Sequence, residues 1–224
     1  NGSIWSSLGG GMNAPVYALA VDGAGNLYAG GDFQNVGSFV AKWNGSTWSP
    51  LTGGMNTRVN ALAVDGTGNL YAGGQFQNVG NFVAKWNGSS WSALSSGVNS
   101  EVFALTVDAS GNLYAGGQFG SAGGVGGTSY IAKWNGSSWS ALGSGMNSRV
   151  FALTVDASGN LFAGGELQSA SGVSANFIAQ WNGSAWSSLG SGMNAPVRAL
   201  KFDSTGKLYA GGYFNSAGGQ SANY

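Results

Sequence analysis

The chain has 224 residues, of which only 7% are charged, against roughly 25% in typical globular domains. Eight basic and eight acidic residues cancel, so the composition gives no electrostatic footprint for binding nucleic acid or an anionic membrane. Cysteine and histidine are absent, which excludes disulfides, thiol catalysis, thiolate zinc sites and any mechanism that needs an imidazole. A hydrophobic content of 43% is still sufficient to build a core.

The first residues, NGSIWSS, match the end of a unit that recurs complete further along the chain. We therefore expect residues 1–8 to form the fourth strand of a repeat. No initiating methionine or signal peptide is visible, so we also expect the chain to be a processed form or part of a longer protein. The short apolar runs predict no membrane insertion.

Five copies of one unit follow. In the first copy, an apolar run ending in aspartate (VYALAVD, 16–22) precedes a glycine-bearing turn and the run LYAGG (27–31). A variable loop leads to FVAKW (39–43), and Asn-Gly then leads to STWSPL (46–51). Short β-branched and aromatic runs bounded by Gly, Asn or Asp predict strands. We place the copies at about 12–51, 55–94, 98–142, 146–189 and 193–224.

Four short strands in each unit of roughly 43–48 residues are typical of a β-propeller. We predict one all-β domain over residues 1–224, with five four-stranded antiparallel blades. In this prediction residues 1–8 pair into the last blade and close the ring, which would remove an exposed sheet edge. About four residues of the last third strand are missing by comparison with 131–134, so a segment of a longer repeat array is the alternative.

The recurring WNGSxW motif predicts a hairpin. Asn-Gly is the preferred pair for a two-residue type I′ turn, so Asn44 and Gly45 are expected to form the whole loop. The flanking Trp43 and Trp48 would then lie diagonally on one face and fill the space between blades. A sugar-binding platform between blades is the alternative. The motif also matches glycosylation acceptors, but the turn requires the same letters, so the match adds little; the asparagines are Asn1, Asn44, Asn87, Asn135 and Asn182.

One aspartate ends the first apolar run of each copy: Asp22, Asp65, Asp108, Asp156 and Asp203. These positions lack the alternating oxygen ligands and bidentate glutamate of a calcium loop. We therefore expect each carboxylate to accept backbone N–H groups across its hairpin loop, and predict no metal or cofactor. The remaining carboxylates are Asp32, Glu101 and Glu166, which form no pair in neighbouring blades. The sequence thus predicts no acid–base pair and no enzyme.

The copies differ from one another mainly at one end of the blades. One variable position follows Gly-Gly: Asp32, Gln75, Gln118, Glu166 and Tyr213. The other lies near the start of the first strand: Tyr17, Asn60, Phe103, Phe151 and Arg198. Both should lie at the same rim, and we predict that they form a ligand-binding surface; drift at exposed positions is the alternative. Alternating charge at Arg58, Glu101 and Arg149 predicts surface ion pairs among them.

The stretch LYAGG…KWNGSSWSAL resembles a kelch repeat, in which Gly-Gly ends the second strand and aromatic residues follow in the third and fourth. The corresponding residues of the first copy are Gly30, Gly31, Trp43 and Trp48. AVDGAGNLYAGG is also similar to bacterial propeller repeats of the NHL and SBBP type. Kelch proteins usually have more than five blades. The resemblance implies a binding or scaffolding role and carries over no catalytic residue.

These observations predict a non-enzymatic module outside the cytoplasm, at a bacterial-type cell surface, that binds a neutral polar ligand on the variable rim. A glycan is the first expectation and a protein partner the second, with no nucleic acid. The alternatives are a structural module of a larger surface assembly, or a designed or recently amplified repeat without an evolved ligand.

Overall fold

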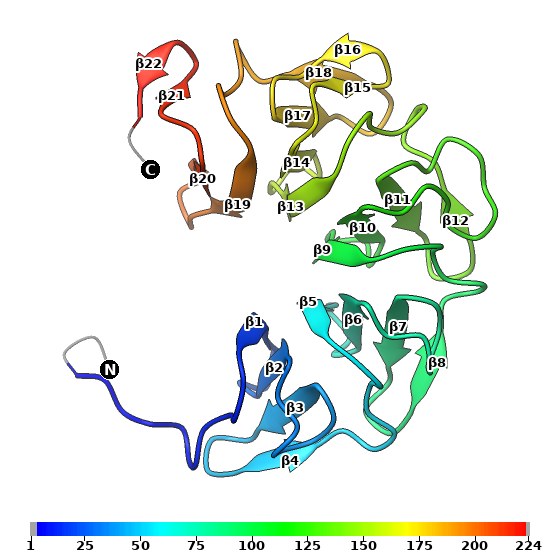
Figure 1. Cartoon of the computed structure of the whole chain (residues 1–224), viewed down its shortest axis with the longest axis vertical. Helices are drawn as coiled ribbons and strands as arrows, with labels where there is room; N and C mark the ends of the chain where they lie inside the picture. Colours follow the sequence, from blue (N-terminus) through cyan, green and yellow to red (C-terminus); the bar gives the residue numbers. More distant parts are fainter. Residues whose placement is uncertain (1–3, 223–224) are drawn as a thin grey trace.

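The computed structural model describes residues 4–222 of the chain. In this range four sheets have four antiparallel strands each and a fifth sheet has two. We call the sheets blades 1 to 5 in chain order. Figure 1 shows them side by side along an arc around an open centre, with the two ends of the chain on the open side. The chain is all-β and built from repeated antiparallel blades, as the sequence predicts.

The two strands nearest the centre come from the most regular parts of each repeat. The inner strands are rich in valine, leucine and alanine: β1 (Val16–Val21), β5 (Val59–Val64), β9 (Val102–Val107), β13 (Val150–Val155) and β19 (Val197–Phe202). The second strands all end in Gly-Gly: β2 (Leu27–Gly31), β6 (Leu70–Gly74), β10 (Leu113–Gly117), β14 (Leu161–Gly165) and β20 (Leu208–Gly212). Consecutive inner strands contact one another along the arc.

The outer strands contain the tryptophans. The third strands end in one: β3 (Val40–Trp43), β7 (Val83–Trp86), β11 (Ile131–Trp134) and β17 (Ile178–Trp181). The fourth strands begin with one: β4 (Trp48–Pro50), β8 (Trp91–Ala93), β12 (Trp139–Ser140) and β18 (Trp186–Ser188). Two small hairpins lie in the loops after Gly-Gly, formed by β15 (Ser169–Ala170) with β16 (Val173–Ser174) and by β21 (Ser216–Ala217) with β22 (Gln220–Ser221).

The hairpin between the first two strands is organised by its aspartate, as predicted. One oxygen of Asp65 accepts the backbone N–H groups of Thr67 and Asn69, at 3.0 and 2.9 Å. The other oxygen accepts the Asn69 amide at 2.8 Å and the Tyr71 hydroxyl at 3.2 Å. Burial alone would raise the pKa of Asp65, but hydrogen bonds from the side chains of Asn69 and Thr67 and from their backbone N–H groups outweigh it and lower the pKa. Burial, followed by the charge of Asp65, raises the pKa of Tyr71 to about 12.

The Asn-Gly turn differs from the two-residue loop that we predicted. Trp43 pairs directly with Trp48, so the loop contains the four residues 44–47. The Asn44 side-chain oxygen accepts the backbone N–H groups of Ser46 at 3.0 Å and Thr47 at 2.9 Å. Gly45 has a φ of 99°, whereas Asn44 is not among the residues with positive φ, so a type I′ turn cannot form. The asparagine side chain replaces the backbone contacts of a tighter turn.

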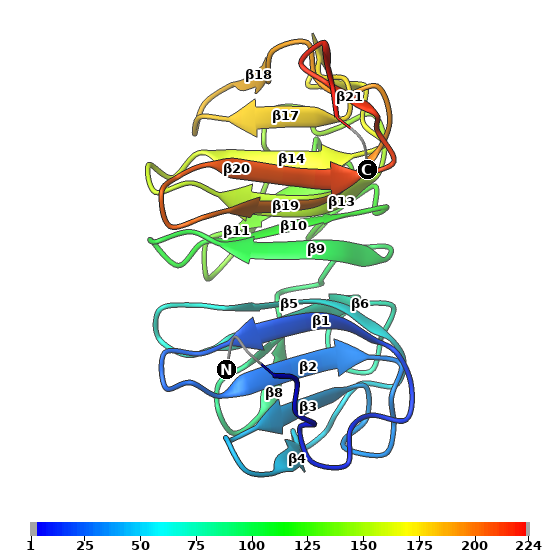
Figure 2. The ribbon, with the colours of Figure 1, turned by 90° about the vertical axis from the view of Figure 1, so that its left-hand side faces the viewer.

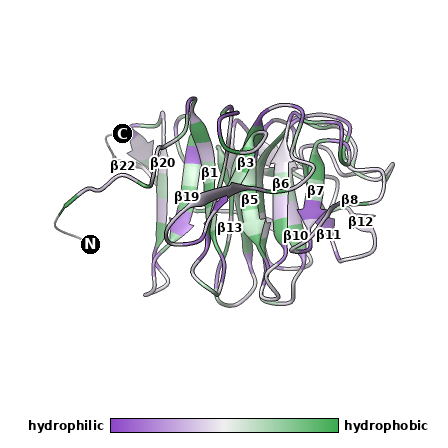
Figure 3. Cartoon of the chain, turned by 90° about the horizontal axis from the view of Figure 1, so that it is seen from below, coloured by the Kyte–Doolittle hydropathy of each residue, from purple (hydrophilic) through white to green (hydrophobic). Residues whose placement is uncertain are grey.

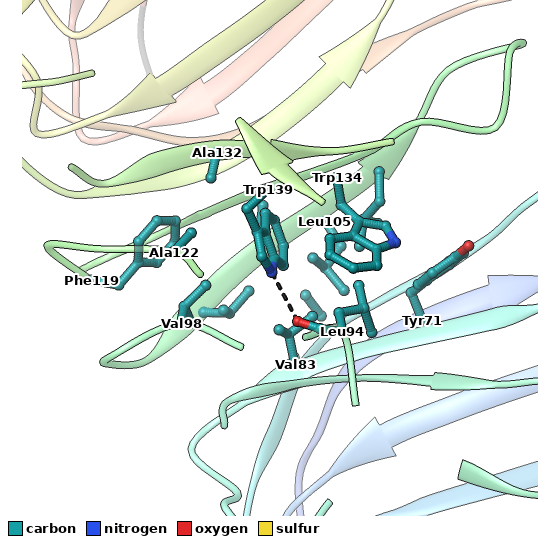
Figure 4. Close-up of a cluster of buried hydrophobic side chains, with 14 of the residues drawn as sticks. Tyr71, Val83, Leu94, Val98, Leu105, Phe119, Ala122, Ala132, Trp134 and Trp139 are labelled. Atoms are coloured by element: carbon teal, nitrogen blue, oxygen red, sulfur yellow. Dashed lines mark hydrogen bonds between the residues drawn. The ribbon is translucent and has the colours of Figure 1, made fainter. Parts of the chain in front are cut away.

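The fourth-strand tryptophans join consecutive blades, as predicted. Trp139 Nε1 of blade 3 donates a hydrogen bond to the backbone oxygen of Leu94, which follows blade 2, at 3.0 Å (Figure 4). Trp186 makes the same bond to Leu142 at 2.9 Å. Trp134 and Trp139 lie in one buried cluster with Leu94. Trp91 Nε1 is buried without a hydrogen-bond partner in the described structure, and nothing there explains the difference.

Closer to the centre, each blade fits a valine into a gap left by glycine. A Cβ on Gly116 would lie only 2.6 Å from Cγ1 of Val150 in the next inner strand. The same distance, from the added Cβ to the valine Cγ1, is 2.5 or 2.6 Å in the equivalent pairs: Gly30 with Val59, Gly73 with Val102 and Gly164 with Val197. All four valines are fully buried. No larger residue leaves room for this contact, which explains why the glycine recurs.

The predicted closure of the ring by residues 1–8 is not observed. Within the described range, residues 4–15 form no strand, and the fifth sheet pairs β19 with β20 alone. Residues 1–3 lie outside the described part. A fourth strand pairs with a third strand, as Trp48 does with Trp43. In the described range the fifth sheet contains no third strand beside β20, so residues 4–8 have no such strand to pair with.

Figure 3 shows the arc from below, with the strands running between two rims of loops and with both hydrophilic and hydrophobic stretches in those loops. No helix that could cross a membrane occurs in residues 4–222.

Replacing Gly116 by alanine should lower the free energy of unfolding by about 1–3 kcal/mol, because the new methyl group overpacks the contact with Val150. Urea unfolding followed by circular dichroism measures the difference. Gly126→Ala is the matched control, since nothing lies within 4 Å of the added Cβ and the residue is exposed. The control should stay within about 0.5 kcal/mol of the wild type. Equal stability of both variants would contradict the tight contact.

Candidate functional site

The variable residues near the start of the inner strands all lie in β-bulges. In blade 1, Val16 pairs with Gly31 and Ala18 with Gly30, so Tyr17 is the extra residue between them. The same shift recurs in the other four blades, at Asn60, Phe103, Phe151 and Arg198. A bulge redirects a side chain and is common beside functional sites. Here it occurs at the end of the strand pair where the variable loops begin.

The second variable set follows the Gly-Gly pair at the same end of each blade. Its backbone N–H groups bond to the linker that enters the inner strand: Asp32 to Pro15, Gln75 to Arg58, Gln118 to Glu101, Glu166 to Arg149 and Tyr213 to Pro196. We call the ten residues of the two sets the variable rim. The structure thus brings both predicted sets together at one edge of the arc. Their binding role stays a prediction.

A three-residue cluster forms the rim between blades 1 and 2. The Arg58 guanidinium donates from Nε and Nη2 to the two oxygens of Asp32, at 2.9 and 2.8 Å. The Tyr17 hydroxyl donates to Asp32 at 2.9 Å, and the Arg58 guanidinium lies 4.8 Å from the centre of the Tyr17 ring. The hydrogen bond from Arg58 holds the pKa of Asp32 below its usual value. The hydrogen bond to Asp32 raises the pKa of Tyr17.

Amide side chains surround the carboxylate of Glu101 between blades 2 and 3. Asn60 donates to it at 2.8 Å and Gln118 at 3.4 Å. The predicted ion pairs among Arg58, Glu101 and Arg149 are therefore wrong. Arg58 pairs with Asp32, because the linker into blade 2 passes beside the end of β2. Arg149 approaches Glu166 of its own blade at 3.8 Å.

A stack of planar groups continues the rim across blades 3 to 5. The rings of Phe103 and Phe151 lie 5.5 Å apart. The Arg198 guanidinium lies 3.8 Å from the centre of the Phe151 ring and 5.0 Å from that of Tyr213. Both phenylalanines are half-buried, whereas Arg198 and Tyr213 are exposed. Arg198 forms no ion pair with any described residue. The stack therefore offers aromatic edges and guanidinium donors to solvent.

Sequence patterns did not single out the aromatic residue that ends each variable loop. Phe39 has a φ of 65°, and Phe82, Tyr130 and Phe177 have similar values of 64°, 64° and 71°. This left-handed conformation is rare for a large side chain. The Phe39 N–H donates to Phe33 and its carbonyl accepts the Gly31 N–H, both at 3.0 Å. The third strand consequently begins one residue later than predicted. The repeated aromatic before VAKW was visible, but strand propensity concealed its conformation.

One hollow lies among the loops of the blades and another at the centre of the arc. One, of about 270 Å³, lies where the loops of blades 2 and 3 meet, and its polar lining includes Gln77, Asn81, Ser96, Asn99 and Ser121. The other is the open centre of the arc, with a volume of about 660 Å³. It is lined by the inner strands of all five blades, with Leu19, Leu62, Leu105, Leu153 and Leu200 at equivalent positions. No group of acidic residues within 4–222 could hold a metal ion.

The arrangement is that of β-propeller repeats. The WD40 β-propeller domain of Doa1 superposes with a TM-score of 0.56 and 14% identity, over 89% of this chain and 62% of that one. An extracellular domain from B. thetaiotaomicron, described as part of a putative hybrid two-component system, superposes with a TM-score of 0.61 and 14% identity. The match covers 92% of this chain and 26% of that one. YCF48 bound to D1 peptide superposes with a TM-score of 0.55 and 16% identity, over 89% of this chain and 60% of that one.

These similarities establish the fold alone, because the sequence identities are low. The chain spans between 26% and 62% of the length of these three structures. No protein-family model and no curated protein sequence matches the chain.

Asp32→Asn should return the pKa of Tyr17 toward 10, because the hydrogen bond to a charged carboxylate is what chiefly raises it. Titration of tyrosines labelled at Cζ, followed by NMR, measures the shift. Asp22→Asn is the matched control: it should leave Tyr17 unchanged and lower the pKa of Tyr28, which is about 12 in the wild type. A Tyr17 pKa that does not respond to Asp32→Asn would show that the two side chains are not bonded in solution.

Proposed function

We propose that this protein is a non-enzymatic, extracellular binding module that holds a neutral polar ligand, first of all a glycan, on the variable rim. The observation that carries the proposal is the half-exposed pair Phe103 and Phe151, whose ring centres are 5.5 Å apart. On the same rim, the amides of Asn60 and Gln118 bond to Glu101. Sites for small ligands combine aromatic surface with a few fixed polar groups. Sugars suit such a surface because their C–H faces pack on rings while their hydroxyls bond to amides and carboxylates.

Two of the rim's carboxylates lie beside arginines, which favours a ligand of low charge, whereas Arg198 forms no ion pair with a described residue and remains available to donate to a polar group. The carboxylate of Asp32 is neutralised by Arg58, and Glu166 lies near Arg149. Glu101 accepts hydrogen bonds from two amides, which leaves it able to accept a further hydroxyl. Gln75 is exposed, and no described residue bonds to its side chain, so it is available as both donor and acceptor.

The structural neighbours are consistent with this role. One of them is an extracellular domain, which supports a location outside the cytoplasm. YCF48 is bound to a peptide, which makes a polypeptide segment the second class of ligand for the rim.

A structural module of a larger surface assembly is the second candidate function. The observation that favours it is the exposure of large apolar side chains on blades 1 and 5, among them Leu19 at 62% and Tyr209 at 59%. Such apolar surface suits contact with a further repeat or with another protein.

The paired variant Phe103→Ala/Phe151→Ala should weaken glycan binding at least about tenfold, equivalent to about 1.4 kcal/mol, because both rings leave the stack. A broad glycan array identifies the ligand, and calorimetry on the best hit measures the affinity. The matched control is Lys207→Ala, an exposed residue in a hairpin loop at the opposite rim. It should bind like the wild type. No saturable binding on the array would refute the glycan proposal, and saturable binding unaffected by the paired variant would refute the site.

A further inference from the structure

The hollow of about 270 Å³ between blades 2 and 3 lies at the same end of the strands as the variable rim. It is formed by the loop after β6, the linker into β9 and the loop after β10. Figure 2 shows β2 and β20 pointing to the right and β1 and β9 to the left, so the loops after Gly-Gly gather at one rim. We call the hollow the loop pocket and define it by Gln77, Asn81, Phe82, Ser96, Asn99 and Ser121.

The loop pocket is open because two side chains that tie loop to linker at the neighbouring boundaries have small counterparts here. Between blades 1 and 2, the Asn78 amide donates to the backbone oxygen of Gly54 at 2.9 Å. Between blades 3 and 4, Ser171 Oγ accepts the backbone N–H of Ser144 at 2.9 Å. The corresponding residues of blade 3 are Ser121 and Gly123.

Two asparagines of the loop pocket each present one unpaired polar atom. Oδ1 of Asn99 accepts the backbone N–H groups of Gly120 and Ser121, at 2.8 and 3.0 Å. Nδ2 of Asn81 donates to the backbone oxygen of Ser96 at 2.9 Å. No described residue bonds to Asn99 Nδ2 or to Asn81 Oδ1. Because each side chain is held by its other atom, one donor and one acceptor are fixed before a ligand arrives.

The rest of the lining adds neutral polar groups and one aromatic ring. No described residue bonds to the Gln77 amide or to the hydroxyls of Ser96 and Ser121, and none of the residues that line the pocket is charged. The half-buried Phe82 supplies apolar surface. These groups suit a small neutral molecule with several hydroxyls, since each hydroxyl both donates and accepts. The volume lies just below the range of about 300–1,000 Å³ of small-ligand pockets, so it fits a single sugar ring.

The loop pocket adjoins the carboxylate of Glu101 on the variable rim. The backbone N–H of Gln118 donates to the Glu101 oxygen, and that of Asn99 donates to the Ser121 oxygen, both at 3.0 Å. Linker and loop therefore run side by side between the pocket and the rim. Asn99 and Glu101 are two residues apart, so their Cα atoms are separated by at most about 7 Å.

We propose that the loop pocket is a subsite for one neutral sugar residue, and that the glycan on the rim is an oligosaccharide that also occupies it. The second part rests on the proposed function, whereas the first part does not. Hydroxyls of the sugar bond to Gln77, Asn81 and Asn99, and its C–H face packs on Phe82.

Titration with neutral sugars, followed by NMR of the side-chain amides, tests the subsite. The probes are glucose, galactose, mannose and N-acetylglucosamine. At least one of them should shift the signals of Gln77 and Asn99 with a dissociation constant in the millimolar range, as suits so small a ligand. The amide of Asn147, at the position of Asn99 in the next linker, is the internal control and should not shift. N-acetylglycinamide, which is neutral but has no hydroxyl, should not bind.

Two variants with matched controls locate the binding. Gln77→Ala should raise the dissociation constant about threefold to tenfold, because the hydrogen bonds of its amide are lost. Gln34→Ala, at the equivalent exposed position of blade 1, should bind like the wild type. Ser121→Asn narrows the pocket and should raise the constant at least about tenfold, whereas Ser169→Asn at the equivalent position of blade 4 should not. Melting curves establish that every variant folds.

The absence of saturable shifts with all four sugars overturns the subsite. An equal response to N-acetylglycinamide, or sugar binding that Ser121→Asn leaves unchanged, does the same. Phe103→Ala/Phe151→Ala should leave these titrations unchanged, so failure of the rim proposal is separate from failure of the subsite. If Gln77→Ala does not weaken the best ligand from the glycan array, the shared oligosaccharide is overturned.

Discussion

The architecture depends on one contact, between the valine that begins each inner strand and the first glycine of the preceding blade's Gly-Gly pair. A Cβ at that glycine would lie 2.5 or 2.6 Å from the valine, so the two blades approach as closely as backbone allows. The residue after the valine is the extra residue of a β-bulge. The contact therefore fixes where the side chains of the variable rim begin, although it does not specify which side chains they are.

The residues that join the blades are different from the residues of the variable rim, and this explains why so much of the fold was predictable. The repeated residues are those that make blade-to-blade and hairpin contacts, such as Gly30, Val59 and Asp65, and a period that repeats them predicts their partners. The Asn-Gly loop was mispredicted for a local reason. Dipeptide preference predicts a turn in which both residues have positive φ, but the Asn44 side chain bonds to two backbone N–H groups and holds a longer loop.

The closed ring could not be derived from the sequence, because closure depends on the rotation between neighbouring blades. A small rotation per blade accumulates along the arc, and no residue pattern encodes its value. The individual side-chain contacts on the rim could not be predicted from the sequence either. The repeat pattern predicts that Tyr17 and Asp32 lie on the same edge. The two hydrogen bonds from Arg58 to the oxygens of Asp32, however, depend on how the linker into blade 2 passes the end of β2.

The variable rim is continuous because its bulge residues lie on adjacent inner strands. Between internal blades, planar groups stack across the boundary, as Phe103 does with Phe151 and Phe151 with Arg198. The side chains that meet across each boundary are therefore those at the bulge positions of adjacent inner strands, and changing one bulge residue alters the surface that two neighbouring blades present.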